Sequence, residues 1–112
     1  MRYRVVLVPF PFDDLSGSKV RPAVCLTNAV GANRHVVLAF ITSAVPPGLE
    51  PTDVLFDPSS ADFVRSGLRV RSALRLHRMV TVSATIIQRQ LGILTPNLQA
   101  QVQQRLRTLF AL

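Results

Sequence analysis

Short apolar runs separated by turn residues fill the first half of the chain, a pattern typical of a strand-rich protein. Runs rich in β-branched and aromatic residues predict strands over residues 3–10, 23–27 and 35–42. The glycine-containing stretch 28–33 can pair the last two as a hairpin, and residues 53–56 can form one more short strand.

A strand with one cationic face is predicted next, after a helical turn at residues 59–66. From position 68 to position 77, apolar and basic residues alternate with the period of a strand. The apolar set is Leu68, Val70, Leu74 and Leu76, and the basic set is Arg69, Arg71, Arg75 and His77. The basic face is either a surface for a polyanion or a solvated face rich in arginine. Arg78 interrupts the apolar face, which predicts a bulge or the strand's end there.

Two helices are predicted at the end of the chain. Ser83 can cap a short helix over residues 84–90 that Gly92 would stop, and Thr95 with Pro96 supplies the N-cap and first-position proline of a second helix. Apolar residues then recur at helical spacing: Leu98, Val102, Leu106, Leu109 and Phe110. The whole pattern predicts a mainly β fold, a small bent antiparallel sheet or partly open barrel, with a C-terminal helix packed on it.

The composition limits the number of domains and the kind of partner. With 112 residues, 48% of them hydrophobic, the chain can build one small core, so residues 1–112 are expected to form a single domain. The formal net charge is +7, and all but one of the thirteen basic residues are arginines, which favours a polyanionic partner. The single cysteine, Cys25, excludes an internal disulfide and a thiolate zinc site. The apolar start is too short to span a bilayer, so we expect a cytoplasmic protein without membrane contact.

An ordered set of short motifs, from about Arg4 to Leu112, narrows the function. Its pieces are the apolar opening at residues 5–12, Arg21-Pro22 after a glycine-containing loop, the run 36–41 ending in Thr42-Ser43, Gly67-Leu68, and the segments 72–76, 80–82 and 91–95. In this order and spacing the chain resembles the MazF/PemK family of toxin ribonucleases. The resemblance implies a small SH3-like (CcdB/PemK-like) antiparallel barrel that forms a homodimer. It also implies cleavage of single-stranded RNA without a metal or cofactor, and inhibition by a cognate acidic antitoxin in a type II toxin–antitoxin system.

Two departures from the family pattern bear on the chemistry. The family usually opens with a Gly-Asp pair, and here Arg2-Tyr3-Arg4 stands in its place. Where some relatives carry Arg-x-Asp late in the chain, this sequence has Arg75-Leu76-His77, so the arginine matches and the acid does not.

Four residues are the candidate catalytic set. By the resemblance, Arg21 would donate charge-assisted hydrogen bonds to the phosphate, and Thr42 would position that phosphate with its hydroxyl. Arg75 could hold a second phosphate oxygen from the basic face. His77 stands where the acid is missing, and an imidazole, whose pKa in water is about 6.5, can act as base or acid near neutrality. The alternative is a surface histidine that marks a weakened site.

A further set of residues is predicted to line the RNA path, through backbone approach, phosphate contact or base stacking. It comprises Phe12, Ser16, Gly17, Lys19, Arg69 and Arg71. No metal site is predicted.

Two other functions stay open. One is a catalytically silent module that binds nucleic acid or antitoxin. The other is a gyrase poison of the related fold, which acts through a tryptophan-containing C-terminus, whereas this chain has no Trp.

Overall fold

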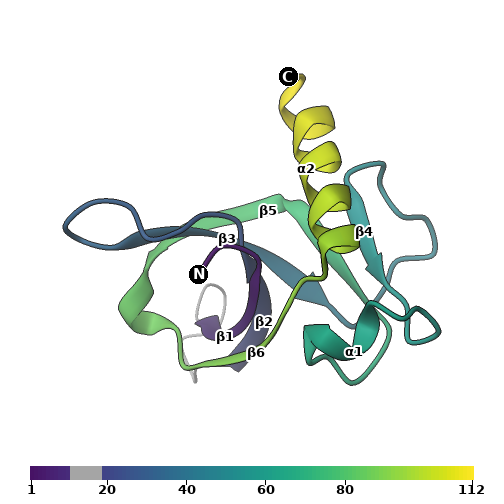
Figure 1. Cartoon of the computed structure of the whole chain (residues 1–112), viewed down its shortest axis with the longest axis horizontal. Coiled ribbons are helices and arrows are strands. Elements are labelled where there is room, and N and C mark those ends of the chain that lie inside the picture. Colours follow the sequence, from purple (N-terminus) through teal and green to yellow (C-terminus); the bar gives the residue numbers. More distant parts are fainter. Residues whose placement is uncertain (11–18) are drawn as a thin grey trace.

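The computed structural model describes residues 1–10 and 19–112, in which strands come first and the long helix last (Figure 1). The elements are β1 (Arg4–Phe10), β2 (Lys19–Cys25), β3 (His35–Thr42), β4 (Asp53–Phe56), α1 (Phe63–Ser66), β5 (Ser72–Ser83), the 3-10 turn η1 (Ala84–Ile86), β6 (Arg89–Ile93) and α2 (Pro96–Phe110). The strands pair antiparallel in the order β4-β5-β3-β2-β1-β6. They form a curled half-barrel, so the predicted mainly β fold with a C-terminal helix is confirmed.

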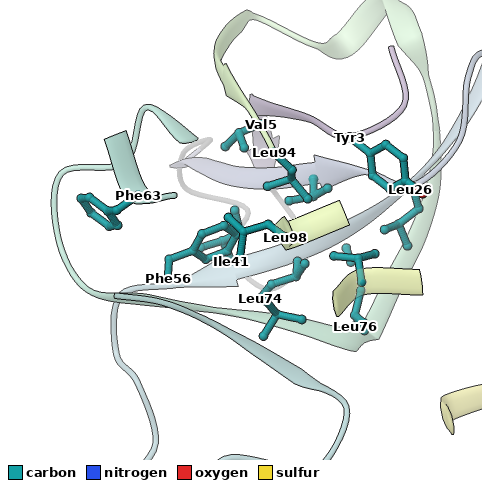
Figure 2. Close-up of a cluster of buried hydrophobic side chains, with 14 residues drawn as sticks. Tyr3, Val5, Leu26, Ile41, Phe56, Phe63, Leu74, Leu76, Leu94 and Leu98 are labelled. Atoms are coloured by element: carbon teal, nitrogen blue, oxygen red, sulfur yellow. The ribbon is translucent and has the colours of Figure 1, made fainter. Parts of the chain in front are cut away.

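Two apolar clusters lie on the two faces of the sheet, because successive side chains of a strand point to opposite faces. The larger cluster gathers around the start of α2, as Figure 2 shows for its labelled side chains. They are Tyr3, Val5, Leu26, Ile41, Phe56, Phe63, Leu74, Leu76, Leu94 and Leu98. The second cluster comprises Val6, Val8, Ala23, Cys25, Val36, Leu38 and Phe40. Residues of β5 and η1 pack against it, among them Val80, Val82 and Ile86.

The strand β2 begins earlier than the sequence pattern indicates, at Lys19 and not at Ala23. It pairs with β1 from Lys19 to Val24, whereas it pairs with β3 only from Ala23 to Cys25. Pro22, which has no N–H to donate, therefore lies beyond the β3 ladder and costs that ladder no hydrogen bond. The consequence for function is that Arg21 stands on a strand and not at the end of a loop.

Two predictions on the second half of the chain are wrong. Residues 68–71 are not part of a strand, because β5 begins at Ser72, and Val70 is 56% exposed and lies outside the core. Residues 84–90 do not form a helix either: Ser83 caps only the single turn of η1, and the chain then enters β6. Pairing of β6 with β1 outweighs the local helical signal here.

Two glycines let α1 approach β6. A Cβ on Gly92 would lie 2.2 Å from the Arg65 carbonyl oxygen, and one on Gly67 would lie 2.1 Å from the Leu91 carbonyl oxygen. Gly67 also has φ +75°, the left-handed conformation of a helix C-cap. Gly92 is therefore a position of close backbone contact and not a helix stop.

The helix α2 begins as predicted. The hydroxyl of Thr95 accepts a hydrogen bond from the Leu98 amide and donates one to Asp62. Hydrogen bonds from Thr95 and then Asn97 lower the pKa of the Asp62 carboxyl. Leu98 and Val102 are buried against the sheet, whereas Phe110 is 56% exposed near the end that points away from it (Figure 1). None of the described helices is long and apolar enough to cross a membrane.

Candidate active site

A row of cross-strand partners carries the candidate site across four strands. Phe40 of β3 stands opposite Ala23 of β2 on one side and opposite Arg75 of β5 on the other. Arg75 in turn stands opposite Asp53 of β4. Directly paired residues direct their side chains to the same face of a sheet, so these four side chains share one face.

Arg21 and Thr42 lie on that same face. Arg21 is two residues from Ala23 along β2, Thr42 is two residues from Phe40 along β3, and alternate residues of a strand share a face. Arg21 is exposed and Thr42 is half-buried. The Thr42 hydroxyl oxygen accepts a hydrogen bond of 3.1 Å from the Ala44 amide, which fixes the oxygen and leaves its O–H to donate.

Arg75 forms an ion pair with a buried carboxylate. Its Nε donates a hydrogen bond of 2.9 Å to Oδ1 of Asp53. The side chain of Asp53 is fully enclosed, whereas that of Arg75 is 22% exposed. A buried charge of this kind needs a close partner, and Arg75 provides it.

His77 approaches the same carboxylate oxygen, with Nδ1 at 3.9 Å from Oδ1 of Asp53. A bulge takes up residues 76–78 of β5, His77 among them, because the β3 partner of Arg75 is Phe40 and the next partner, Ala39, faces Met79. The predicted interruption near Arg78 is therefore a bulge. The side chain of His77 is 40% exposed, so the imidazole is open to a ligand from solvent.

The structure joins some of the predicted RNA-binding residues to this face and separates others. Lys19 is exposed on β2, two residues from Arg21, and so shares its face. Arg69 and Arg71 are exposed, but they lie before β5 and not on its basic face, because the strand starts at Ser72. Three further predicted residues, Phe12, Ser16 and Gly17, lie outside the described residues.

Asp53 is the member of the cluster that the sequence analysis missed. Its signal was an acid at the head of the otherwise apolar strand Asp-Val-Leu-Phe. Only the pairing of β4 with β5 brings this carboxylate to Arg75, which is 22 residues away in sequence. Within residues 1–10 and 19–112, no group of three or more His, Cys, Asp or Glu side chains could hold a metal ion.

This site can do two kinds of chemistry. Guanidinium groups on β2 and β5 and a hydroxyl on β3 are donors for the oxygens of a phosphodiester. The accessible imidazole of His77 can move a proton. With strands about 4.8 Å apart, the backbones of β2 and β5 are separated by about 10 Å, a gap that two arginine side chains can bridge around one phosphate.

Comparison with known proteins agrees with this architecture. The profile of the family described as "PemK-like, MazF-like toxin of type II toxin-antitoxin system" matches residues 1–110. The Mycobacterium tuberculosis toxin MazF-mt6 is 22% identical, with a TM-score of 0.73 over 97% of each chain. An endoribonuclease from a mycobacterial species, solved in complex with its cognate antitoxin, is 21% identical, with a TM-score of 0.69 over 100% of this chain and 95% of that one. No curated protein sequence matches the chain. At this identity the two structures are similar to the chain in fold.

Proposed function

The chain belongs to the PemK-like, MazF-like toxins of type II toxin–antitoxin systems, and from that membership and the geometry of its site we propose that it is an endoribonuclease. Its substrate is single-stranded RNA, which it cuts at selected sequences and without a metal ion. The attacking group is the RNA's own 2′-hydroxyl. The similar mycobacterial endoribonuclease supports this reading at the level of the fold.

The observation that carries the proposal is the shared face of three donors from three strands. Arg21, Thr42 and Arg75 reach one side of the sheet through the register of β2, β3 and β5. Attack by the 2′-oxygen adds negative charge to the phosphate oxygens, and cationic donors placed there beforehand stabilise that charge. Thr42 lies on the middle strand of the three, and its hydroxyl oxygen already accepts from the Ala44 amide, so its O–H can donate to a phosphate held by the two arginines.

Each catalytic residue has a distinct part in the step. The 2′-oxygen bonds to phosphorus as it loses its proton, and the bond from phosphorus to the 5′-oxygen breaks as that oxygen gains one. The products are a 2′,3′-cyclic phosphate and a 5′-hydroxyl end. Arg21 and Arg75 bind the phosphate oxygens, Thr42 donates its hydroxyl to the same group, and His77 is the proton-transfer group.

Partners follow from the charge and from the family. The net charge of +7 favours both RNA and an acidic antitoxin. The mycobacterial endoribonuclease was solved with its cognate antitoxin, which makes the same kind of partner part of this proposal. The family resemblance also implies a homodimer, so the proposal takes residues 1–112 as one domain of a cytoplasmic homodimer.

The test is cleavage of a long, mixed-sequence RNA with EDTA present, followed by mapping of the ends. Wild type should give discrete cuts with cyclic-phosphate or 3′-phosphate ends. Arg21→Ala should lower the rate about 100-fold or more, as loss of one oxyanion donor does in other enzymes. Arg107→Ala is the matched control, because it removes one positive charge from the exposed side of α2.

His77→Ala separates a catalytic histidine from a surface one. A loss of about 100-fold or more would support proton transfer by the imidazole. Wild type that binds RNA but does not cut it would overturn the enzymatic proposal and leave the silent binding module. Cuts that vanish in EDTA and return with Mg²⁺ would contradict the metal-independent mechanism.

A further inference from the structure

Among the described residues of the site, the carboxylate of Asp53 is fully enclosed, whereas its two basic neighbours, Arg75 and His77, are open to solvent. A buried carboxylate needs donors for both oxygens. Oδ1 accepts from the Arg75 Nε at 2.9 Å, and Oδ2 accepts from the Glu50 amide at 2.7 Å. The group is thus fixed from two sides.

The turn that presents Asp53 is fixed as well. The Asp53 amide donates to the Glu50 carbonyl oxygen at 2.9 Å, so residues 50–53 close on themselves. Arg105 of α2 donates from Nη1 to the Pro51 carbonyl oxygen at 2.6 Å. The C-terminal helix therefore holds the same turn from outside, and the carboxylate has little room to move.

The choice of Nε decides what Arg75 can offer a ligand. The guanidinium is planar, with one N–H on Nε and four on the two Nη atoms. A bond from Nε to a rigid carboxylate sets the plane and direction of the group and leaves the Nη pair for the next acceptor. That pair is the part of an arginine that matches two oxygens of one phosphate.

We propose that Asp53 is a positioning residue for RNA cleavage, which fixes the Arg75 guanidinium so that its Nη groups meet the scissile phosphate. This inference rests on the proposed function and adds a residue to it. Asp53 also lies 3.9 Å from the His77 imidazole and forms an ion pair with it when the imidazole is protonated. The same buried carboxylate thus lies beside both basic side chains of the β5 face, although only Arg75 is hydrogen-bonded to it.

Asp53→Asn tests this role with little change in shape. An amide has one acceptor oxygen where the carboxylate has two, so either the Arg75 Nε or the Glu50 amide loses its acceptor. Misplacement of a reacting group by about 1 Å can cost about 100-fold in rate. We expect kcat to fall about 10- to 100-fold while KM changes less than about 3-fold, because Arg75 meets charge that develops in the transition state. Asp57→Asn, which changes an exposed carboxylate bonded to Ser59, is the matched control and should leave kcat within about 2-fold.

A double-mutant cycle distinguishes positioning from a general loss of structure. If Asp53 acts through Arg75, Asp53→Asn should lower kcat less than about 3-fold further in an Arg75→Ala background. If the two effects multiply in full, the inference is overturned while the proposed function stands. Should Asp53→Asn fail to fold, Asp53→Glu replaces it in the cycle, since it keeps the charge and both acceptors but shifts them by one methylene.

A readout independent of cleavage completes the test. The Nε–H signal of Arg75 in ¹⁵N–¹H spectra, assigned by its loss in Arg75→Ala, should exchange slowly with water in wild type and rapidly in folded Asp53→Asn. Equal exchange in the two proteins would overturn the inference. If wild type cuts no RNA, the proposed function fails first, and the exchange rate of the Arg75 Nε–H decides separately whether Asp53 fixes the guanidinium. A faster rate in folded Asp53→Asn keeps Asp53 as the residue that positions Arg75, and an unchanged rate removes that role.

Discussion

Substitution of Gly92 by alanine tests how closely α1 is seated on β6. An added Cβ would lie 2.2 Å from the Arg65 carbonyl oxygen and 2.5 and 2.6 Å from the carbonyl carbon and oxygen of Ser66. All three are backbone atoms, so a side-chain rotation cannot relieve the contact, and α1 must move. Movement of α1 would also shift Arg65, which lies in it, and the residues that follow it, Arg69 and Arg71.

The expected cost follows from the contact. Overpacking typically costs about 1–3 kcal/mol, and displacement of backbone puts Gly92→Ala at the upper end. Alanine also lowers the conformational entropy of the unfolded chain, which stabilises the folded protein by about 0.5–1 kcal/mol. The net loss in the free energy of unfolding is therefore about 2 kcal/mol. For 112 residues the entropy of unfolding is about 0.24 kcal/mol/K, so Tm should fall by about 8 °C.

Thermal unfolding followed by circular dichroism measures the effect. Gly48→Ala is the matched control, because an added Cβ there has nothing within 4 Å and Gly48 has no left-handed φ. Its Tm should stay the same or rise slightly. Equal Tm values for the two variants would refute the argument that backbone contact requires glycine at position 92.

Two further predictions concern the cap of α2 and the buried thiol. Thr95→Ala removes the acceptor for the Leu98 amide and the donor to Asp62, so urea unfolding should show a loss of about 1–2 kcal/mol in the free energy of unfolding. Thr108→Ala, near the other end of the helix, is the control and should change that free energy by less than about 0.5 kcal/mol. Burial raises the pKa of the Cys25 thiol to about 11, from 9.0, so a thiol reagent at pH 8 should label it only as fast as the chain opens, and immediate labelling of the folded protein would contradict this burial. Because the pKa of Cys25 is higher in the folded protein, the unfolded chain loses the thiol proton first as the pH rises. The contribution of this thiol to the free energy of unfolding is complete below about pH 9 and is lost as the pH rises toward 11. Cys25→Ala should reduce this loss of stability at high pH.

Elements with strong local signals were predictable from the sequence. The strands over residues 35–42 and 53–56 and the start of α2 at Pro96 match the structure to the residue. Two of the three have a clear cause within the segment: a continuous apolar run for the longer strand, and a threonine cap followed by proline for the helix. Such signals act over a few residues, so distant partners do not change them.

Elements that depend on a distant partner were not predictable. Residues 84–90 carry a cap and helix-forming residues, yet β1 recruits residues 89–93 as its second neighbour in the sheet. The alternation after Gly67 holds at Leu74 and Leu76 but not at Val70, because β4 pairs only with the part of β5 that starts at Ser72. The alternation in the sequence indicates that a strand is present, whereas the first and last residues of that strand depend on where the neighbouring strand ends.

The candidate site follows the same rule. The basic pattern indicated Arg75 and His77, and the family resemblance indicated Arg21 and Thr42, but the register of the sheet decides whether they share a face. No spacing in the sequence pairs Asp53 with Arg75. Some relatives of the family carry an acid two positions after the arginine, where this chain has His77, and here a carboxylate reaches Arg75 from the adjacent strand.

Because the row from Ala23 to Asp53 runs through β2, β3, β5 and β4, no local segment can hold the site by itself. A slip of one residue between β3 and β5 would move Arg75 to the opposite face. Formation of the site is therefore tied to formation of the sheet, and a variant that loosens the sheet loses activity without touching a catalytic group. A loss of cleavage can be attributed to a missing catalytic group only where the variant keeps the wild-type Tm. Arg21 lies at an exposed strand position, so its substitution is a cleaner test of catalysis than substitution of the buried Asp53. The role of Asp53 therefore needs the double-mutant cycle.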